Sequence, residues 1–329
     1  MLASSETVLQ AAPNTAPPAY RRGYSPPKGM RSIIADAHRT RCGLTLAVAV
    51  GDHAVIWLVV AAACFLALHA PLIAGVVAVA VAVVVVARQL RALECLVHES
   101  SHYNWSRGHR RCNDVLAFAL AGMPTGARIS DYRASHLLHH GRFGTGQDPD
   151  RQRYLELGLE ELPAGSRWAA AGQLVRLLPR YQIGWMRTLR TSPVYLVLPL
   201  LWTVIAVAPT AIILGSRAAM LATAVWLVGF LLVLPMIRLI GEASEHVYAG
   251  TDTVFDATIS NLGRWQRLVV HPHNDGYHTV HHLWPGVPHH ALRSLHEALI
   301  EHDPDGYGRR LRVRTRLLEV PRSGVLTGR

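Results

Sequence analysis

Four long apolar runs restrict what this chain can fold into more than any other feature of its sequence. The runs carry few charged residues and cover about residues 45–68, 71–94, 194–214 and 218–240. A helix needs about 20 apolar residues to cross the ~30 Å hydrocarbon layer of a bilayer. The first two runs are joined by His69–Ala70 and the last two by Gly215–Arg217. Such short connectors predict four transmembrane helices in two hairpins, rather than the core helices of a large soluble protein.

The basic residues predict an orientation in the membrane. The chain has 33 Lys and Arg against 22 Asp and Glu, a formal charge of +11. Six basic residues lie in residues 1–42, thirteen between Tyr103 and Pro193, and ten after His246, whereas the two connectors carry only Arg217. Positive residues gather on the cytoplasmic side of membrane proteins. We therefore expect both termini and the middle segment to be cytoplasmic, and the charge needs no nucleic acid partner to explain it.

The two ends of the chain differ in composition from the apolar runs. Residues 1–42 are rich in Pro, Ser and Ala and lack the apolar core of a signal peptide, which predicts a largely disordered cytoplasmic arm. Residues 303–329 form a basic C-terminal tail. We expect residues 43–302 to form one domain. The four cysteines have no C-x-x-C spacing, which argues against zinc ribbons and thioredoxin-like motifs.

The 19 histidines are clustered rather than spread along the chain. Most of the clustering is in His98-Glu-Ser-Ser-His102, His136-Leu-Leu-His139-His140 and His278-Thr-Val-His281-His282. Residues three or four apart share a helix face, so each motif can direct two or three imidazoles at one point. Neutral imidazole is a common ligand of iron, zinc and copper. Two H-x-x-H-H motifs in one chain are rare by chance, so the pattern predicts a metal centre.

The first motif also fits the zinc metalloprotease signature H-E-x-x-H, in which the glutamate is the general base. A catalytic zinc needs only three protein ligands, whereas the three motifs offer eight histidines. Eight imidazoles suit two metal ions, and imidazole-rich sites with open positions for oxygen favour iron. A membrane zinc protease and a metal transporter remain the alternatives from other classes, although the motifs lie outside the apolar runs.

The three motifs, their order and the two hairpins resemble the membrane fatty acid desaturase superfamily over about residues 50–302. Further similarities are Asp148-Pro149-Asp150, Glu245-His246, the segment 272–288 around the third motif, and Leu295-His296. The first motif departs from many family members in having Glu99 where they carry Asp. The resemblance implies an all-α integral membrane protein of a bacterial inner membrane. Its four transmembrane helices would support a cytoplasmic helical cap that carries a di-iron site.

The resemblance also implies which side chains hold the irons, and it predicts no catalytic residue beyond these ligands. The nine expected ligands are His98, His102, His136, His139, His140, His246, His278, His281 and His282. Nearby carboxylates are expected to accept a hydrogen bond from the second ring N–H of these histidines. For each carboxylate, an ion pair with an Arg is the alternative. The carboxylates are Glu99, Asp148, Asp150, Glu242, Glu245 and Asp275.

The end of the fourth run allows a more specific expectation. Glu242 and His246 are four residues apart, so they share a face if the helix continues through both. Glu242 is then expected to bind the same iron directly or through water, or to form a hydrogen bond with one of its ligands. Glu245 lies about 100° to the side of the helix and is a less natural direct ligand. A simple ion pair between Glu242 and Arg238 is the alternative.

The reaction implied by the resemblance is O₂-dependent desaturation. Two irons would use O₂ and two electrons to remove hydrogen from an acyl chain or a related aliphatic substrate. Hydroxylases share the motifs, so a hydroxylase or a desaturase of a smaller metabolite remains an alternative. The chain has no His-Pro-Gly-Gly heme signature and too few cysteines for a fused iron–sulfur domain. We therefore expect a separate ferredoxin or cytochrome-type electron donor, acidic enough to suit the basic face.

Overall fold

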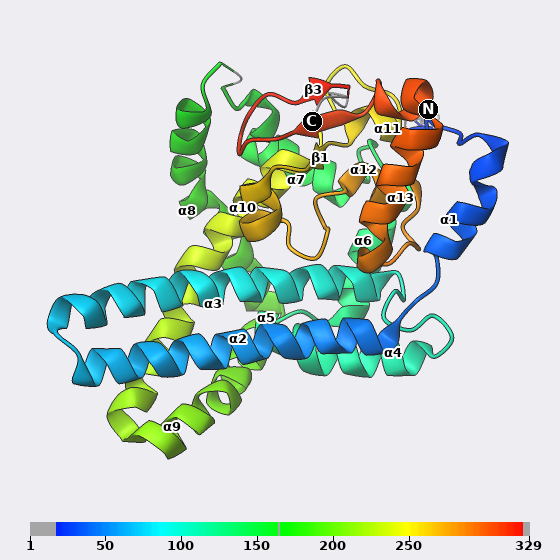
Figure 1. Cartoon of the computed structure of the whole chain (residues 1–329). Coiled ribbons are helices and arrows are strands. Elements are labelled where there is room, and N and C mark those ends of the chain that lie inside the picture. The colour runs from blue at the N-terminus through cyan, green and yellow to red at the C-terminus, as the bar shows by residue number, and fades with distance from the viewer. Residues whose placement is uncertain (1–17, 164, 325–329) are drawn as a thin grey trace, which may run out of the picture.

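The first pair of apolar runs forms a long antiparallel hairpin. The computed structural model describes residues 18–163 and 165–324. In it, α2 (Cys42–His69) and α3 (Leu72–Ser101) lie side by side along most of their length (Figure 1). Pro71 precedes the first turn of α3, where its missing N–H costs nothing. A Cβ on Gly75 would lie 2.9 Å from the Cα of Ala67, so only glycine allows this close approach.

The second pair of runs forms one bent element. Helix α9 (Val194–Val228) continues through the π-helical segment η4 (Gly229–Val233) into α10 (Leu234–Glu245). Inside α9, Gly215 has φ 81° and ψ −177°, so two helical arms meet there at an angle. By length and composition, the described residues contain three helices able to cross a membrane: Cys42–His69, Leu72–Ser101 and Val194–Glu245. The third and fourth expected helices are thus the two arms of this last element.

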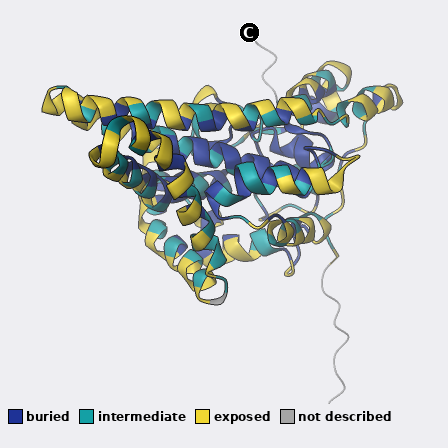
Figure 2. Ribbon diagram, turned by 90° about the horizontal axis from the view of Figure 1, so that it is seen from below, coloured by how far each residue is buried: buried dark blue, intermediate teal, exposed yellow. Residues whose placement is uncertain are grey.

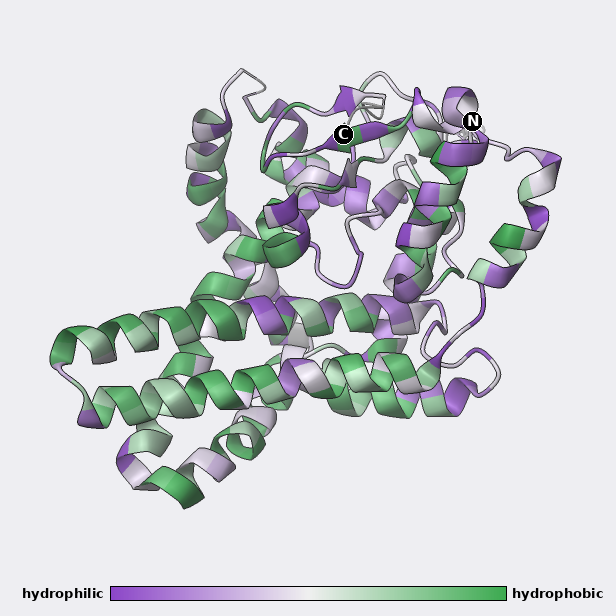
Figure 3. Cartoon of the chain, viewed as in Figure 1, coloured by the Kyte–Doolittle hydropathy of each residue, from purple (hydrophilic) through white to green (hydrophobic). Residues whose placement is uncertain are grey.

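The outward faces of the long helices are apolar. The most exposed large side chains include Leu72 (82%), Ile73 (80%) and Ile212 (84%). Figure 2 shows exposed residues along these helices, and Figure 3 shows that the same helices are coloured as hydrophobic. A soluble protein rarely exposes a continuous apolar surface of this extent. The arrangement agrees with a membrane protein.

Most of the remaining elements form a cap on one side of the α2–α3 hairpin, whereas α4 (Arg110–Ala117) lies alongside α2 (Figure 1). Between α3 and α9 the elements are α4, η2 (Phe118–Gly122), α5 (Met123–Thr125), α6 (Ile129–Gly141), α7 (Pro149–Leu157), η3 (Leu159–Glu161) and α8 (Arg167–Thr191). After α10 they are α11 (Val254–Ala257), β1 (Ser260–Asn261), η5 (Gln266–Val270), α12 (His278–Leu283), α13 (His289–His302), η6 (Pro304–Gly308), β2 (Arg312–Arg314) and β3 (Arg322–Ser323). The strands form one small sheet in which β2 pairs parallel to β1 and antiparallel to β3.

The N-terminal arm is folded where the structure describes it. Its short helices are η1 (Lys28–Met30) and α1 (Arg31–Ala37), and Met30 is only 1% exposed. The ring of Tyr24 stacks on Phe255 at 5.3 Å between centroids, and its hydroxyl donates a 2.7 Å hydrogen bond to Asp303. The prediction of a disordered arm is therefore wrong for residues 18–42, because a few apolar anchors attach a polar segment to the cap. Residues 1–17 of the predicted arm lie outside the described residues.

The basic tail also belongs to the cap. Tyr307 and Leu311 are fully buried, and β2 pairs with β1. Within the described residues, no break in the fold coincides with the expected boundary at 302. Both ends of the chain thus pack against the segment that carries the third histidine motif.

Candidate metal centre

The nine predicted histidines come together from four separate parts of the fold. The last turn and the end of α3 supply His98 and His102, and α12 supplies the third motif. Helix α6 supplies the second motif, and His246 directly follows α10. Their ring nitrogens form a five-histidine group and a four-histidine group. The five-histidine group is His98, His102, His136, His140 and His281, and the four-histidine group is His139, His246, His278 and His282.

Short distances between Nε2 atoms define the five-histidine group. The Nε2 atom of His98 lies 2.9 Å from that of His136 and 3.0 Å from that of His281. His140 lies 3.1 Å from both His136 and His281 by the same atoms. The Nε2 atom of His102 is 2.9 Å from that of His136. Five imidazole nitrogens therefore face one small volume.

The four-histidine group is built in the same way at slightly greater distances. His246 is central, with its Nε2 atom 3.0 Å from that of His278 and 3.2 Å from that of His282. His139 approaches His282 at 3.4 Å between Nε2 atoms. His246 can reach this position because the chain becomes extended there, with φ −129° and ψ 158°.

These distances suit metal ligation. Two imidazole nitrogens bound about 2.1 Å from one ion and at right angles to each other lie about 3.0 Å apart. Burial, reinforced by the ring of His98, holds the pKa of His136 well below its usual range. Burial likewise lowers the pKa of His140, His246, His278, His281 and His282. These six rings are therefore neutral at pH 7, which is the protonation state that binds a metal ion. The pKa of His139 is instead raised, because the nearby carboxylates of Asp150 and Asp148 outweigh the effect of burial.

Two carboxylates contact the Nδ1 atoms of ligand histidines, on the side of the ring opposite Nε2. Asp148 is fully buried, and its Oδ1 atom lies 2.8 Å from Nδ1 of His139. Asp148 also caps α7 by accepting the backbone N–H of Asp150 at 3.0 Å. Burial alone would raise the pKa of Asp148, but its hydrogen bonds, first that with His139, hold it below its usual value. A carboxylate on Nδ1 leaves the Nε2 lone pair of His139 free for a metal. Asp150 is more distant, with Oδ2 3.5 Å from the same nitrogen.

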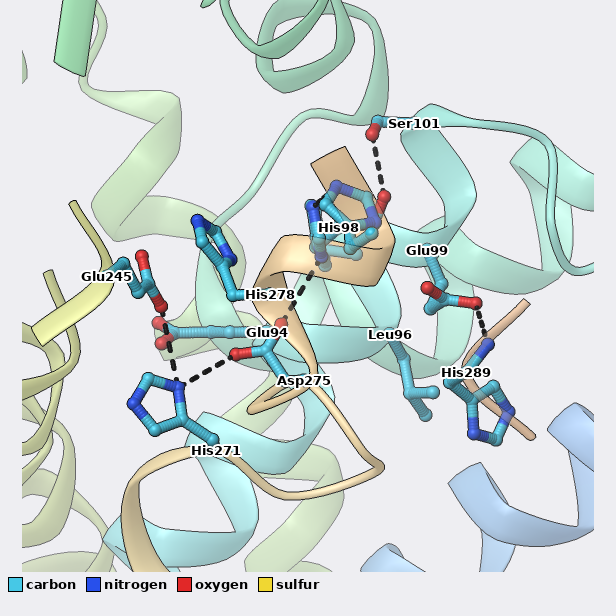
Figure 4. A network of polar contacts seen from close by, with 12 residues as sticks. Glu94, Leu96, His98, Glu99, Ser101, Glu245, His271, Asp275, His278 and His289 are labelled. Atoms are coloured by element: carbon cyan, nitrogen blue, oxygen red, sulfur yellow. Dashed lines mark hydrogen bonds and ion pairs between the residues drawn. The ribbon is translucent and has the colours of Figure 1, made fainter. Parts of the chain in front are cut away.

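Asp275 has the corresponding place behind the five-histidine group (Figure 4). Its Oδ1 atom lies 3.4 Å from Nδ1 of His98, and its Oδ2 atom lies 3.3 Å from Nδ1 of His271. Arg91 donates to the same carboxylate at 3.0 Å. Burial would raise the pKa of Asp275, but the contacts with His271, His98 and Arg91 keep it well below its usual range. Asp275 is therefore an anion that can orient His98.

Glu99 does not have the place that we expected. It is 3% exposed, and its Oε2 atom accepts the backbone N–H of His289 at 2.6 Å, as Figure 4 shows. None of the hydrogen bonds between described residues joins Glu99 to a ring of the three motifs. The residue after His98 on a helix points about 100° away from it, which is why Glu99 meets α13 instead. The prediction that Glu99 orients a ligand is corrected: this side chain ties α3 to α13.

Glu242 is not part of the histidine groups either. Its Oε1 atom accepts a 2.7 Å hydrogen bond from the Tyr181 hydroxyl, and its Oε2 atom pairs with Nε of Arg153 at 2.9 Å. Helix α10 ends at Glu245, so Glu242 and His246 do not share a helix face. The alternative pairing is wrong as well, because Arg238 pairs with Glu94 of α3. The expected contact of Glu242 with the metal ligands is thus corrected by the position of the helix end.

Two contributing residues were not singled out from the sequence. Arg91 reaches Asp275, and His271 lies between Asp275 and Glu245, with Nδ1 3.4 Å from Oε1 of Glu245. A signal for Arg91 was available, because ionisable residues inside an apolar span are costly and commonly functional. His271 carries no such signal, since it lies outside the three motifs.

Comparison with known proteins gave a family match, which covers most of the chain. The sequence profile of the family described as fatty acid desaturase matches residues 72–315, a range that includes all nine histidines. A search of curated proteins gave no significant match.

Proposed function

Because the chain belongs to the fatty acid desaturase family, we propose that it is an O₂-dependent di-iron desaturase that acts on an acyl chain or a related aliphatic substrate. The observation that carries the proposal is the convergence of nine imidazole nitrogens in two adjacent groups. The two groups would each hold one iron. Bound iron would supply the O₂ reduction needed to attack an unactivated C–H bond.

The protein's own residues prepare the site for this chemistry. Asp148 holds His139, and Asp275 holds His98, in the tautomer whose Nε2 lone pair faces its group. Burial lowers the pKa of His246, His278 and His282 and so favours their neutral form, and all four rings of the four-histidine group are shielded from water. Exclusion of water protects a reactive centre from side reactions.

The zinc protease alternative loses support from the position of Glu99. In the H-E-x-x-H mechanism, this glutamate must face the water on the metal and take its proton. Here its carboxylate is buried and accepts the N–H of His289. Because the carboxylate is bound to the start of α13, it is not available as a general base at the histidine groups.

We also propose that the chain crosses the membrane four times, with both termini and the metal centre on the cytoplasmic side. Helices α2 and α3 would provide two crossings, and the two arms that meet at Gly215 the others. The Arg distribution supports this orientation. Reporter fusions at position 216 should report the outer side, and fusions at positions 160 and 329 the cytoplasm. A fusion at 329 that reports the outer side would contradict the proposal.

The exposed side chains of helix α8 suit a helix that lies at the membrane surface. Its exposed side chains Trp168, Val175 and Met186 are 7 and 11 residues apart, so they share one face. Beside this apolar stripe lie the exposed residues Arg176, Arg180 and Arg187. A helix with an apolar stripe flanked by Arg is typical of the interface between headgroups and acyl chains.

An external electron donor completes the proposal. We propose an acidic ferredoxin or cytochrome, and what supports it is the +11 charge together with the absence from the sequence of a heme or iron–sulfur motif. The decisive test is expression with a supplied redox partner, followed by metal analysis and mass spectrometry of the products. We expect about two irons per chain and products lighter by two hydrogens. Products heavier by one oxygen would identify the hydroxylase alternative, and one zinc per chain would contradict the di-iron proposal.

A further inference from the structure

Glu245 is a partly buried carboxylate, and among the described residues its one permanently charged partner, Arg91, is shared with Glu94 and Asp275. Glu245 is the last residue of α10, and its side chain is 16% exposed. Its nearest polar neighbours are Nδ1 of His271 at 3.4 Å and Nη2 of Arg91 at 3.8 Å. Among the described residues, none donates a hydrogen bond to this carboxylate. A carboxylate in such surroundings is costly unless a cation lies close to it.

The same carboxylate lies beside the four-histidine group. One of its oxygens and the ligand nitrogens of His246 and His278 all lie within 4.8 Å of one another. Ligands on opposite sides of one ion, each about 2.1 Å from it, lie about 4.2 Å apart. Figure 4 shows Glu245 and His278 close together, with His271 on the other side of the carboxylate. The separation in the structure is therefore close to the range that ligands of one ion span.

The end of α10 explains why Glu245, and not Glu242, lies beside the four-histidine group. Because the helix stops at Glu245 and His246 is extended, the two neighbouring side chains approach the same group from different directions. Glu242, one turn earlier, faces Tyr181 and Arg153 instead. The four-histidine group also has one imidazole fewer than its neighbour. A carboxylate oxygen would supply the fifth protein ligand.

We infer that Glu245 is a direct carboxylate ligand of the metal ion held by the four-histidine group. The inference rests on the proposed di-iron function and makes the two ions chemically different. One ion would have five nitrogen ligands, and the other four nitrogens and one oxygen. Carboxylate oxygen is a harder ligand than imidazole and offsets the charge of a ferric ion in a buried site.

The test compares Glu245→Gln with the matched control Glu242→Gln in detergent-purified protein loaded with ⁵⁷Fe. Both variants remove one negative charge from the same helix, but only one of them is close to the histidines. We expect the wild type to hold about two irons, with two distinct Mössbauer doublets. Glu245→Gln should lose or shift one doublet, with iron falling toward about one per chain, whereas Glu242→Gln should keep both. Two unchanged doublets in Glu245→Gln would overturn the inference.

A second variant covers the case in which Glu245→Gln does not fold. Glu245→Asp keeps a carboxylate on a shorter side chain, so we expect two irons with only one doublet altered. Unchanged spectra would again overturn the inference. A wild type that binds no iron would instead contradict the proposed function, so the two failures are distinguishable.

Discussion

The two histidine groups use the same side chain but differ in their surroundings. Four members of the five-histidine group, His98, His102, His136 and His140, are partly exposed. All four members of the other group are buried. The five-histidine group lies at the end of α3 and along α6, and Tyr132, which is 38% exposed, stacks on His136 at 5.6 Å. We therefore expect solvent and small molecules to reach the five-histidine group, called the open group below, more readily than the four-histidine group, called the closed group.

The carboxylates that contact the two groups differ in how closely they approach the histidines. His139 of the closed group has Asp148 at 2.8 Å, in a fully buried pair. His98 of the open group has Asp275 at 3.4 Å, and Asp275 also serves Arg91 and His271. Both carboxylates have other partners, but the hydrogen bond of Asp148 is the shorter one, and a short hydrogen bond restrains an imidazole more than a long one. The closed group is thus the more rigid anchor, and the open group has more freedom to adjust.

The largest expected effect is the loss of any one histidine from either group. His140→Ala in the open group and His282→Ala in the closed group should each lower turnover by more than the 10–100-fold typical of changes outside the ligand set. Product formation and iron content measure this effect. His302→Ala is the control, because His302 is exposed at the end of α13 and its one hydrogen bond to another described residue is with the Ala298 carbonyl. Full turnover in His140→Ala would remove the open group from the proposed ligands.

Removing the carboxylates that contact the histidines should weaken iron binding by a different amount in each group. Asp148→Asn leaves His139 without its anionic partner, and we expect about 10–100-fold weaker iron binding. Asp275→Asn should cost less, because its contact with His98 is longer. Iron titration followed by dialysis measures both affinities. Equal losses, or a larger loss for Asp275→Asn, would contradict the difference in rigidity.

Metal removal should also be asymmetric. A water-soluble ferrous chelator added to the reduced protein should remove iron from the open group first, because four of its rings are partly exposed. We expect two kinetic phases, with the faster one at least several-fold faster and ending near one iron per chain. Absorbance of the chelate measures the rate. A single phase that removes both irons together would show that exposure of the rings does not govern access.

The smallest effect is expected at Glu99. Glu99→Gln keeps a carbonyl oxygen to accept the N–H of His289, so iron content and turnover should change by less than about tenfold. The same assays as for the histidine variants apply. If Glu99 were a general base at the metal, the amide would abolish turnover, and the proposed role between α3 and α13 would be wrong.

Local patterns in the sequence predicted most of the ligand set. The three motifs need only helical spacing to direct His98 with His102, or His281 with His282, to a common side. The apolar runs likewise predicted the α2–α3 hairpin, because a helix of that composition is stable wherever water is absent. His246 was predicted on the family resemblance, and the structure brings it to the other ligands although it lies beyond the helix end.

Contacts between distant segments were decided by the tertiary structure alone. Glu99 and His289 are 190 residues apart, and Arg91 and Asp275 are 184 apart, so no periodicity relates them. The exchange of roles between Glu242 and Glu245 depends on where α10 ends, and helix ends are set by packing as much as by local preference. The folded N-terminal arm depends on apolar pockets formed by the C-terminal segment. The sequence alone determined which side chains could meet a metal, because helical spacing and apolar length are local properties. The tertiary structure decided which carboxylates accompany them, because each such contact depends on how separate elements pack.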